Sequence, residues 1–363
     1  MTNPENQQQC MAELAAAMLD WPQATLSVRP LQISPWLAMS LLQKSIRRGE
    51  VGFALSAAAT LLSSAPDKLW RRLRVAAYED IGLADLEAVS LALAGTSSKR
   101  TRMALGGNWR VASFLAMRLA NAKKCRSADD LLMTLLDHPA YQHDRLRLTF
   151  QTTSDLMKVA SGNDDIVTRA IALCYALGTD RWNPNSLRQR KGHPAYCFSQ
   201  MLDDGFPHCV LELAQRGFNG VREPLPVLMS LLSRECPGLS HCSCEADEFP
   251  ETVMIGDVPG WAVDQYTRKG KEALRRFLQS DTATAAWVRR NVLQRQQLRF
   301  LGGIVFRAEG GLLKDRMRWP LGDRLREQMD IEANGCGVAA AAEPLALMRN
   351  DLSSLNEERK YVR

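Results

Sequence analysis

Almost the whole chain consists of short apolar segments with helical spacing, and this pattern limits the fold more than any other feature. Leu, Ala and Met recur at intervals of three and four, and breaks containing Gly, Ser, Pro or Asp separate the segments. The expected helices lie at residues 11–21, 37–48, 51–64, 68–80, 86–95, 108–124, 127–138, 165–178, 261–280 and 283–303. Only residues 252–258 and 301–306 are typical of short strands. The pattern therefore predicts an all-α protein made of packed helix hairpins.

Composition predicts a folded chain with more than one domain. The 363 residues are 46% apolar and 24% charged, which is enough to build a sizeable core. A segment rich in Pro, Gly, Ser and Cys interrupts the helical pattern and predicts a linker or long loop. The expected order is an N-terminal segment 1–30, a helical domain 31–234, the linker 235–260, a basic helical domain 261–334 and a loosely attached C-terminal tail 335–363.

The sequence predicts neither a membrane protein nor a secreted one. It holds no run of about 18 apolar residues, and its start, MTNPENQQQC, lacks the basic and apolar regions of a secretory signal. Nine cysteines scattered through helical segments are typical of reduced thiols rather than of a disulfide framework. We therefore expect a cytoplasmic protein.

The stretch WRRLRVAAYEDIGLAD, residues 70–85, gathers arginines and an acidic pair ahead of a glycine. Gly82 can adopt the left-handed conformation that ends a helix, and Asp85 can cap the helix that follows. The stretch therefore predicts a sharp corner between two helices. A partly buried charge network is expected to hold this corner, made of Arg71, Arg72, Arg74, Glu79 and Asp80. A solvated set of surface salt bridges is the alternative.

A second motif, KSIRRGEVGFAL at residues 44–55, precedes the corner motif. Together the two are similar to the helical region that follows the ATPase module in the replication-associated recombination protein A family, the RarA or MgsA-type relatives of clamp loaders. The positions that match the family's patterns are Lys44, Ser45, Arg47, Ala54 and Leu55, then Arg71, Arg72, Leu73, Ala77, Glu79, Asp80, Ile81, Gly82, Leu83, Ala84 and Asp85. The resemblance covers about 60 residues, from 37 to 94.

The resemblance implies a collar-like domain and a role in DNA replication, repair or recombination. In that family the helical region serves oligomerisation, and members act at stalled or gapped replication forks and bind DNA near single-strand ends. A homo-oligomer is therefore expected. The ATPase module has no counterpart here, because the sequence holds no GxxxxGK[ST] phosphate loop. We expect no intrinsic nucleotide hydrolysis, and an ATPase on a separate chain is the partner that this absence suggests.

The segment from 268 to 299 is strongly basic and is the best candidate for a ligand surface. Arginine forks match the geometry of phosphates, and aromatic residues at 261, 266, 287 and 319 could stack on unpaired bases. The residues predicted to bind nucleic acid are Arg268, Lys269, Lys271, Arg275, Arg276, Arg289, Arg290, Arg295 and Arg299. By contrast, Arg47 and Arg48 stand beside Gly49 at an expected helix end and are assigned to a C-cap or a subunit contact.

The leading hypothesis is a non-catalytic, DNA-associated accessory protein that needs no cofactor and binds single-stranded or forked DNA. The alternative is a helical scaffold that binds a clamp-loader-like ATPase or another protein through the same arginines. Cys236, His241, Cys242 and Cys244 could donate to zinc, but their spacing is poor for a finger and no metal site is expected. The five histidines form no recognisable catalytic pattern.

Overall fold

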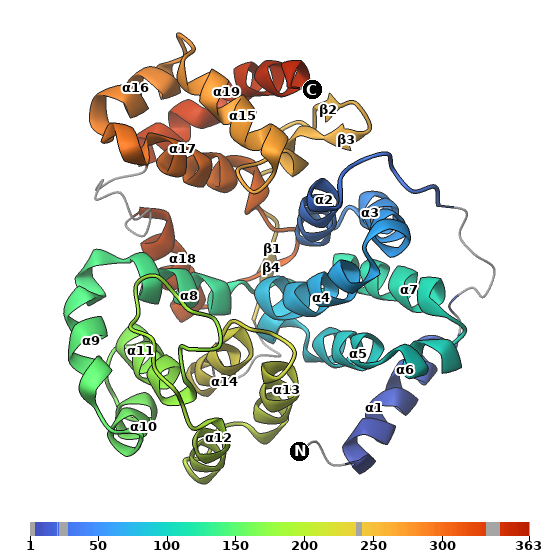
Figure 1. Cartoon of the computed structure of the whole chain (residues 1–363), viewed down its shortest axis with the longest axis vertical. Helices are drawn as coiled ribbons and strands as arrows, with labels where there is room; N and C mark the ends of the chain where they lie inside the picture. Colours follow the sequence, from blue (N-terminus) through green and yellow to red (C-terminus); the bar gives the residue numbers. More distant parts are fainter. Residues whose placement is uncertain (1–3, 20, 22–27, 237–241, 332–341, 363) are drawn as a thin grey trace.

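The computed structural model describes residues 4–19, 21, 28–236, 242–331 and 342–362. These residues form an almost entirely helical protein (Figure 1), which confirms the all-α prediction. The α-helices are α1 (Pro4–Ala17), α2 (Pro35–Arg48), α3 (Val51–Ser64), α4 (Pro66–Ala76), α5 (Leu86–Ser97), α6 (Lys99–Ala104), α7 (Asn108–Asn121), α8 (Ser127–Asp137), α9 (Gln142–Arg147), α10 (Thr153–Ser161), α11 (Ile166–Leu177), α12 (Pro194–Asp203), α13 (His208–Phe218), α14 (Leu225–Glu235), α15 (Arg268–Leu278), α16 (Ala283–Asn291), α17 (Gln297–Val305), α18 (Pro320–Ile331) and α19 (Ala342–Tyr361).

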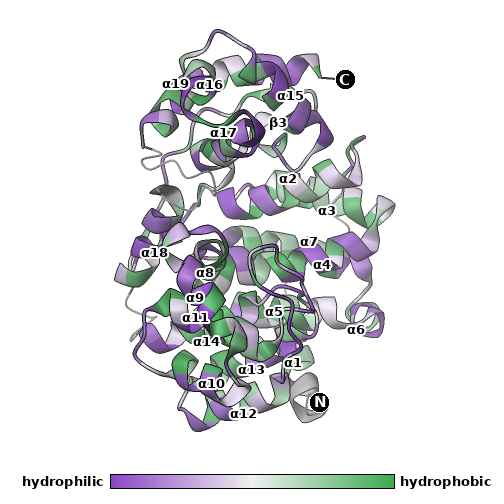
Figure 2. Ribbon diagram, turned by 60° about the vertical axis from the view of Figure 1, so that its left-hand side comes forward, coloured by the Kyte–Doolittle hydropathy of each residue, from purple (hydrophilic) through white to green (hydrophobic). Residues whose placement is uncertain are grey.

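Two clusters of buried apolar side chains organise the described chain. The larger cluster draws on helices from α1 to α14 and on residues of α18, and we call this part the large lobe. The smaller cluster is built by α15, α16, α17 and α19, and we call this part the small lobe. Figure 1 shows the small lobe at the top in orange and red, and Figure 2 shows the same division from another side.

The basic helix α2 begins and ends at residues suited to those positions. The Ser34 side chain accepts a hydrogen bond from the backbone N–H of Leu37 (3.3 Å), and Pro35 occupies the first helical position. Gly49 ends the helix with a φ of +69°, a conformation that favours glycine. The chain then turns directly into α3, so that α2 and α3 form the first helix hairpin.

The corner predicted at residues 70–85 is present, and its shape is unusual. After α4 the backbone passes through a π-helical turn, η1 (Ala77–Ile81), and a 3₁₀ turn, η2 (Gly82–Ala84), before α5 begins. Gly82 has a φ of +51°, and the Asp85 side chain accepts a hydrogen bond from the N–H of Ala88 (2.9 Å). The helix end at Gly82 and the cap at Asp85 are both confirmed.

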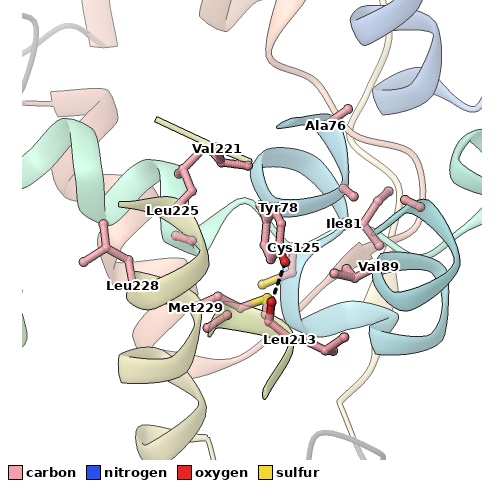
Figure 3. Packing of buried hydrophobic residues seen from close by; sticks show 14 of the residues in the cluster. Ala76, Tyr78, Ile81, Val89, Cys125, Leu213, Val221, Leu225, Leu228 and Met229 are labelled. Atoms are coloured by element: carbon pink, nitrogen blue, oxygen red, sulfur yellow. Dashed lines mark hydrogen bonds between the residues drawn. The ribbon is translucent and has the colours of Figure 1, made fainter. Parts of the chain in front are cut away.

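Tyr78 fastens this corner to the interior of the large lobe. Its ring is fully buried, and its hydroxyl donates a hydrogen bond to the backbone oxygen of Leu213 in α13 (2.7 Å; Figure 3). Leu225, Leu228 and Met229 of α14 lie on the same side of the corner (Figure 3). The π-helical turn therefore sits inside the core, where the side chains that it carries have fixed positions.

Two predictions for the small lobe differ from the structure. Residues 301–306, expected as a strand, belong to α17 and the turn after it, because their apolar side chains pack against the helices around them. The C-terminal segment, expected as a loose tail, contains α19, and Met348, Leu352 and Leu355 of this helix are buried in the small lobe. Burial of these three side chains holds α19 in place.

The lobes are connected by a segment with little regular structure. It contains β1 (Cys244–Glu245), which pairs antiparallel with β4 (Arg316–Met317), and β2 (Met254–Ile255), which pairs antiparallel with β3 (Val258–Pro259). The single strand expected at 252–258 is therefore divided by a turn at 256–257 into β2 and the start of β3.

The packing divides the chain differently from the expected domain boundaries. Trp261 belongs to the core of the large lobe and lies edge-on to Phe53, with ring centroids 5.9 Å apart. The helix α18 packs against α8, also in the large lobe. Residues at both ends of the expected basic domain therefore belong to the large lobe.

Among the described residues, no helix combines the length and the apolar character that a membrane span needs.

Candidate functional site

The nine basic residues predicted to bind nucleic acid are all exposed on the small lobe. The helix α15 is strongly two-sided: Ala273, Leu274 and Phe277 are buried, and its charged residues are exposed. This arrangement presents the charges away from the core. We call the full set the basic surface; it consists of Arg268, Lys269, Lys271, Arg275 and Arg276 on α15, Arg289 and Arg290 on α16, Arg295 on the 3₁₀ turn η7 (Gln294–Gln296), and Arg299 on α17.

The members of the basic surface differ in what they contact. Four have protein partners: Arg275 pairs with Glu272, Arg276 with Glu358, Arg299 with Asp137 of the large lobe, and Arg289 donates to the backbone oxygens of Leu278 and Ser280. Such exposed ion pairs are weak and can be exchanged for a ligand. The described residues give no hydrogen bond or ion pair to the side chains of the other five, which are Arg268, Lys269, Lys271, Arg290 and Arg295.

The sequence predicts four aromatic side chains on which unpaired bases could stack, but three of them are buried in the structure. Trp261, Trp287 and Trp319 are buried in the two cores, because each ring packs against apolar neighbours. A nucleic-acid base therefore cannot stack on any of these three rings. Tyr266 is different, since its side chain is 67% exposed and stands just before α15.

The charge network at the corner is present and is mostly buried, but it differs in membership from the prediction. Asp80 is fully buried and accepts hydrogen bonds from Arg47 (Nε to Oδ1, 2.6 Å) and from Arg126 (2.5 Å). Glu79 accepts from the same two arginines, at 2.5 Å and 3.1 Å. The two carboxylates therefore share two guanidinium groups that lie outside the predicted set.

The three arginines predicted for this network have other roles. Arg72 donates to the side-chain oxygen of Gln43 (2.6 Å), and it acts on the network only through its positive charge, which helps to lower the pKa of Glu79. Arg74 donates to the side chain and backbone oxygens of Thr96, and Arg71 is exposed. Helical spacing places these three residues near the acids along the chain, but it does not show which distant arginines pack against them.

Arg47 and Arg48 do not serve the helix cap or the subunit contact that the sequence predicts, and that assignment is wrong. Both side chains are buried. The Arg48 guanidinium lies over the rings of Phe249 (4.4 Å) and Trp261 (5.0 Å), and the backbone N–H groups of Gly49 and Glu50 cap α2. The sequence signal for their burial is weak, because the two arginines follow an amphipathic helix whose end is expected at the surface.

Burial and neighbouring charges shift the pKa values of several groups here. Burial alone would raise the pKa of Glu79, but the charges of Arg47, Arg126 and Arg72 outweigh it and lower that pKa to about 2. Burial raises the pKa of Asp129 to about 7 against the pull of Arg126, and the negative charges of Glu79 and Asp130 add to the rise. Asp129 therefore titrates near neutral pH.

The small lobe and the segment just before α15 complete this network. Lys44 of α2 lies 2.6 Å from the carboxylate of Asp264, and the Arg47 guanidinium donates to the backbone oxygen of Gly310 (3.1 Å). Arg47 and Arg126 both lie over the Phe306 ring, at 5.2 Å and 5.6 Å. The charged residues of the corner therefore also hold the two lobes together.

A second π-helical turn faces the first across the contact between the lobes. The turn η8 (Phe306–Gly310) follows α17 as η1 follows α4, and each is closed by a backbone hydrogen bond from a glycine N–H, Gly82 or Gly311. The fourth residue of each turn is a buried acid that pairs with a buried arginine: Asp80 with Arg47, and Glu309 with Arg359. Such turns are often found at functional sites.

A cleft of about 650 Å³ opens between the lobes beside this network. Its volume is in the range of ligand-binding pockets. Tyr266 and Trp36 contribute aromatic side chains to its wall. The basic residues of the wall are Lys44, Arg47, Arg72, Arg126, Arg299 and Arg307, and the acidic residues are Glu79, Asp129, Asp137 and Asp264.

The cysteine-rich segment offers no assembled metal site in the described part of the chain. There, no group of three or more His, Cys, Asp or Glu side chains is placed to hold a metal ion. Cys236 is buried, and Cys244 lies exposed on β1. His241, the histidine weighed as a ligand, lies outside the described residues.

Comparisons with protein-family models, with curated proteins and with solved structures found no match to this chain. The resemblance to the RarA-type helical region therefore stays a prediction that rests on the two sequence motifs. In the structure these motifs touch each other, since Arg47 of the first pairs with Glu79 and Asp80 of the second.

Proposed function

We propose that this protein binds nucleic acid through the basic surface and serves as a non-catalytic accessory in DNA replication, repair or recombination. The observation that carries the proposal is the exposure of all nine basic residues on one lobe, five of them without a protein partner among the described residues. Between residues 268 and 305 these nine stand against two acids, Glu272 and Asp281. Positive charge of this density attracts the phosphate backbone and gains affinity by releasing counterions.

The sequence motifs support the DNA-related part of the proposal. The residues that resemble the RarA-type family form the corner and its charge network, where a collar-like domain would need a rigid core. An oligomer and a separate ATPase chain are further parts of the proposal, and both follow from the resemblance alone.

A helical scaffold that binds another protein through the same arginines is the competing function. One observation favours it: the three tryptophans near the basic surface are buried, so the surface offers fewer stacking partners than a dedicated single-strand binder uses. Arginine also suits protein interfaces.

A DNA titration with matched charge reversals separates the two. Fluorescent single-stranded, duplex and forked DNA are titrated with the protein at two salt concentrations. The Lys271→Glu/Arg290→Glu variant should bind at least about tenfold more weakly, and its salt slope should fall by about one unit for each phosphate that the protein no longer neutralises.

The matched control is Lys191→Glu/Arg222→Glu, which makes the same charge change at exposed residues of the large lobe. It should bind nearly as the unaltered protein does. Equal losses in both variants would show that net charge alone drives binding. Unchanged DNA binding by Lys271→Glu/Arg290→Glu, with loss of a protein partner in a pull-down, would establish the scaffold function instead.

A further inference from the structure

The cleft between the lobes has the chemistry to hold one nucleotide. A nucleotide needs an aromatic or flat surface for its base, hydrogen-bonding groups for the base edge and a cation for its phosphate. The wall of the cleft carries Tyr266, Gln265 and Arg299, which are of these three kinds.

Tyr266 has the flat aromatic ring on which a base can stack. Its side chain is 67% exposed although it lines the cleft, and no described ring or cation lies over its face. Trp36, the other exposed aromatic of the wall, already has the Lys68 ammonium over its ring at 4.4 Å. Tyr266 therefore offers the open face. Its backbone is held in place, because the Tyr266 N–H donates to the Asp264 side chain (3.0 Å) and Asp264 pairs with Lys44.

Gln265 offers the group for the base edge. Its amide makes no side-chain hydrogen bond to any described residue, and an amide can both donate to and accept from a base. The side chain crosses Gly302 of α17 so closely that a Cβ atom at position 302 would lie 2.2 Å from the Gln265 Oε1 atom. The lack of a side chain at residue 302 thus leaves room for the amide beside the cleft.

Arg299 connects the cleft to the basic surface. It belongs to both sets, its side chain is 59% exposed, and its one ion pair, with Asp137, is exposed enough to be exchanged for a phosphate. Arg72, at the opposite wall in α4, uses only one of its five N–H donors in a hydrogen bond to a described residue. A strand that follows the basic surface would reach the cleft at Arg299.

We propose that the cleft binds a single unpaired nucleotide, with its base stacked on Tyr266 and its phosphate on Arg299. This inference rests on the proposed function, because an unpaired residue of a bound strand is the expected source of the nucleotide. A free mononucleotide has the same chemistry, and the experiment below distinguishes the two sources.

The test compares Tyr266→Leu with Tyr266→Phe in the full chain. The probe is a single-stranded oligonucleotide that contains one 2-aminopurine, whose fluorescence is quenched by stacking. Tyr266→Leu should weaken binding by roughly 5- to 100-fold, the loss expected for one base–aromatic stack, and should abolish the quenching. Tyr266→Phe keeps the ring and should retain both. The salt slope should stay the same in both variants, because neither changes a cation that neutralises a phosphate.

Tyr196→Leu is the matched control, since Tyr196 is also exposed, on α12 of the large lobe. It should bind as the unaltered protein does. If Tyr266→Leu binds and quenches normally while Lys271→Glu/Arg290→Glu loses affinity, the basic surface stands and the cleft inference is overturned.

If the unaltered protein binds no DNA, the proposed function fails and adenosine monophosphate decides the remaining question. Binding of this nucleotide by calorimetry, lost in Tyr266→Leu and kept in Tyr266→Phe, would assign the cleft to a free nucleotide. No binding of it would overturn the inference.

Discussion

The Nζ atom of Lys44 lies 2.6 Å from Oδ2 of Asp264, and this buried ion pair joins α2 to the segment just before α15 across 220 positions of sequence. The two side chains are 4% and 5% exposed. Burial lowers the pKa of Lys44, and Asp264 offsets part of that effect. The backbone at Tyr266 is held by the same pair, since the Asp264 side chain also accepts from the Tyr266 backbone N–H.

Removal of either partner should destabilise the fold strongly. Lys44→Met or Asp264→Asn should lower the free energy of unfolding by about 3–5 kcal/mol, because each leaves one buried group without its partner. The double variant Lys44→Met/Asp264→Asn should lose less than the sum of the two single losses. Urea unfolding of all three measures this coupling. The exposed pair Lys158–Asp155 is the control, and Lys158→Ala should leave the free energy of unfolding nearly unchanged. Additive losses would mean that the ion pair does not form.

Asp80 should be the acid on which the corner depends most. Asp80→Ala removes the acceptor shared by Arg47 and Arg126, so about 3–5 kcal/mol of stability should be lost. Glu87→Ala changes an acid that is 74% exposed and pairs only at the surface, and it should cost less than about 1 kcal/mol. Thermal and urea unfolding of the two variants provide the comparison. Similar small losses in both would show that the corner does not need its buried acid.

Much of this corner could be predicted from the sequence, because its signals are local. Gly82 and Asp85 follow from the known preferences of helix ends, and both lie where they are expected. The exposed face of α15 likewise follows from helical spacing.

The partners of the acids could not be predicted, because they are set by packing between distant segments. Arg47 lies 33 positions from Asp80 and Arg126 lies 46 positions from it. The π-helical turns could not be predicted either, because apolar residues spaced at 3.6 residues per turn do not show where a turn contains one extra residue. The prediction for residues 301–306 is wrong because a short apolar run fits a strand and a buried helix equally well.

The raised pKa of Asp129 should make stability fall as pH rises towards neutral. The pKa is about 7 in the folded protein against an ordinary value of 3.8, so between these values the folded protein holds a proton that the unfolded chain has released. Glu79 acts in the opposite sense, and its stabilisation is lost as pH falls from 4.5 to about 2.

The Asp129→Asn variant isolates the first effect. The free energy of unfolding of the variant, relative to that of the unaltered protein, should be larger at about pH 8 than at about pH 5, which means that the variant is relatively more stable at the higher pH. Urea unfolding at the two pH values measures it. If the variant and the unaltered protein differ in free energy of unfolding by the same amount at both pH values, Asp129 is already ionised at pH 5, and the charge of Arg126 outweighs burial.

Gly217 should tolerate no side chain, because Tyr78 occupies the space beside it. An added Cβ atom would lie 2.0 Å from the Tyr78 hydroxyl oxygen, and that hydroxyl is held by its hydrogen bond to Leu213. Gly217→Ala must therefore displace a fully buried ring, and it should lower the free energy of unfolding by about 1–3 kcal/mol despite the better helix propensity of alanine. Gly52→Ala, in α3, is the matched control, since no atom lies within 4 Å of its added Cβ, and it should be neutral or stabilising by up to about 1 kcal/mol. A shift to a higher urea midpoint in both variants would contradict the packing of the corner against α13, because it would mean that the Tyr78 ring can leave its place without loss.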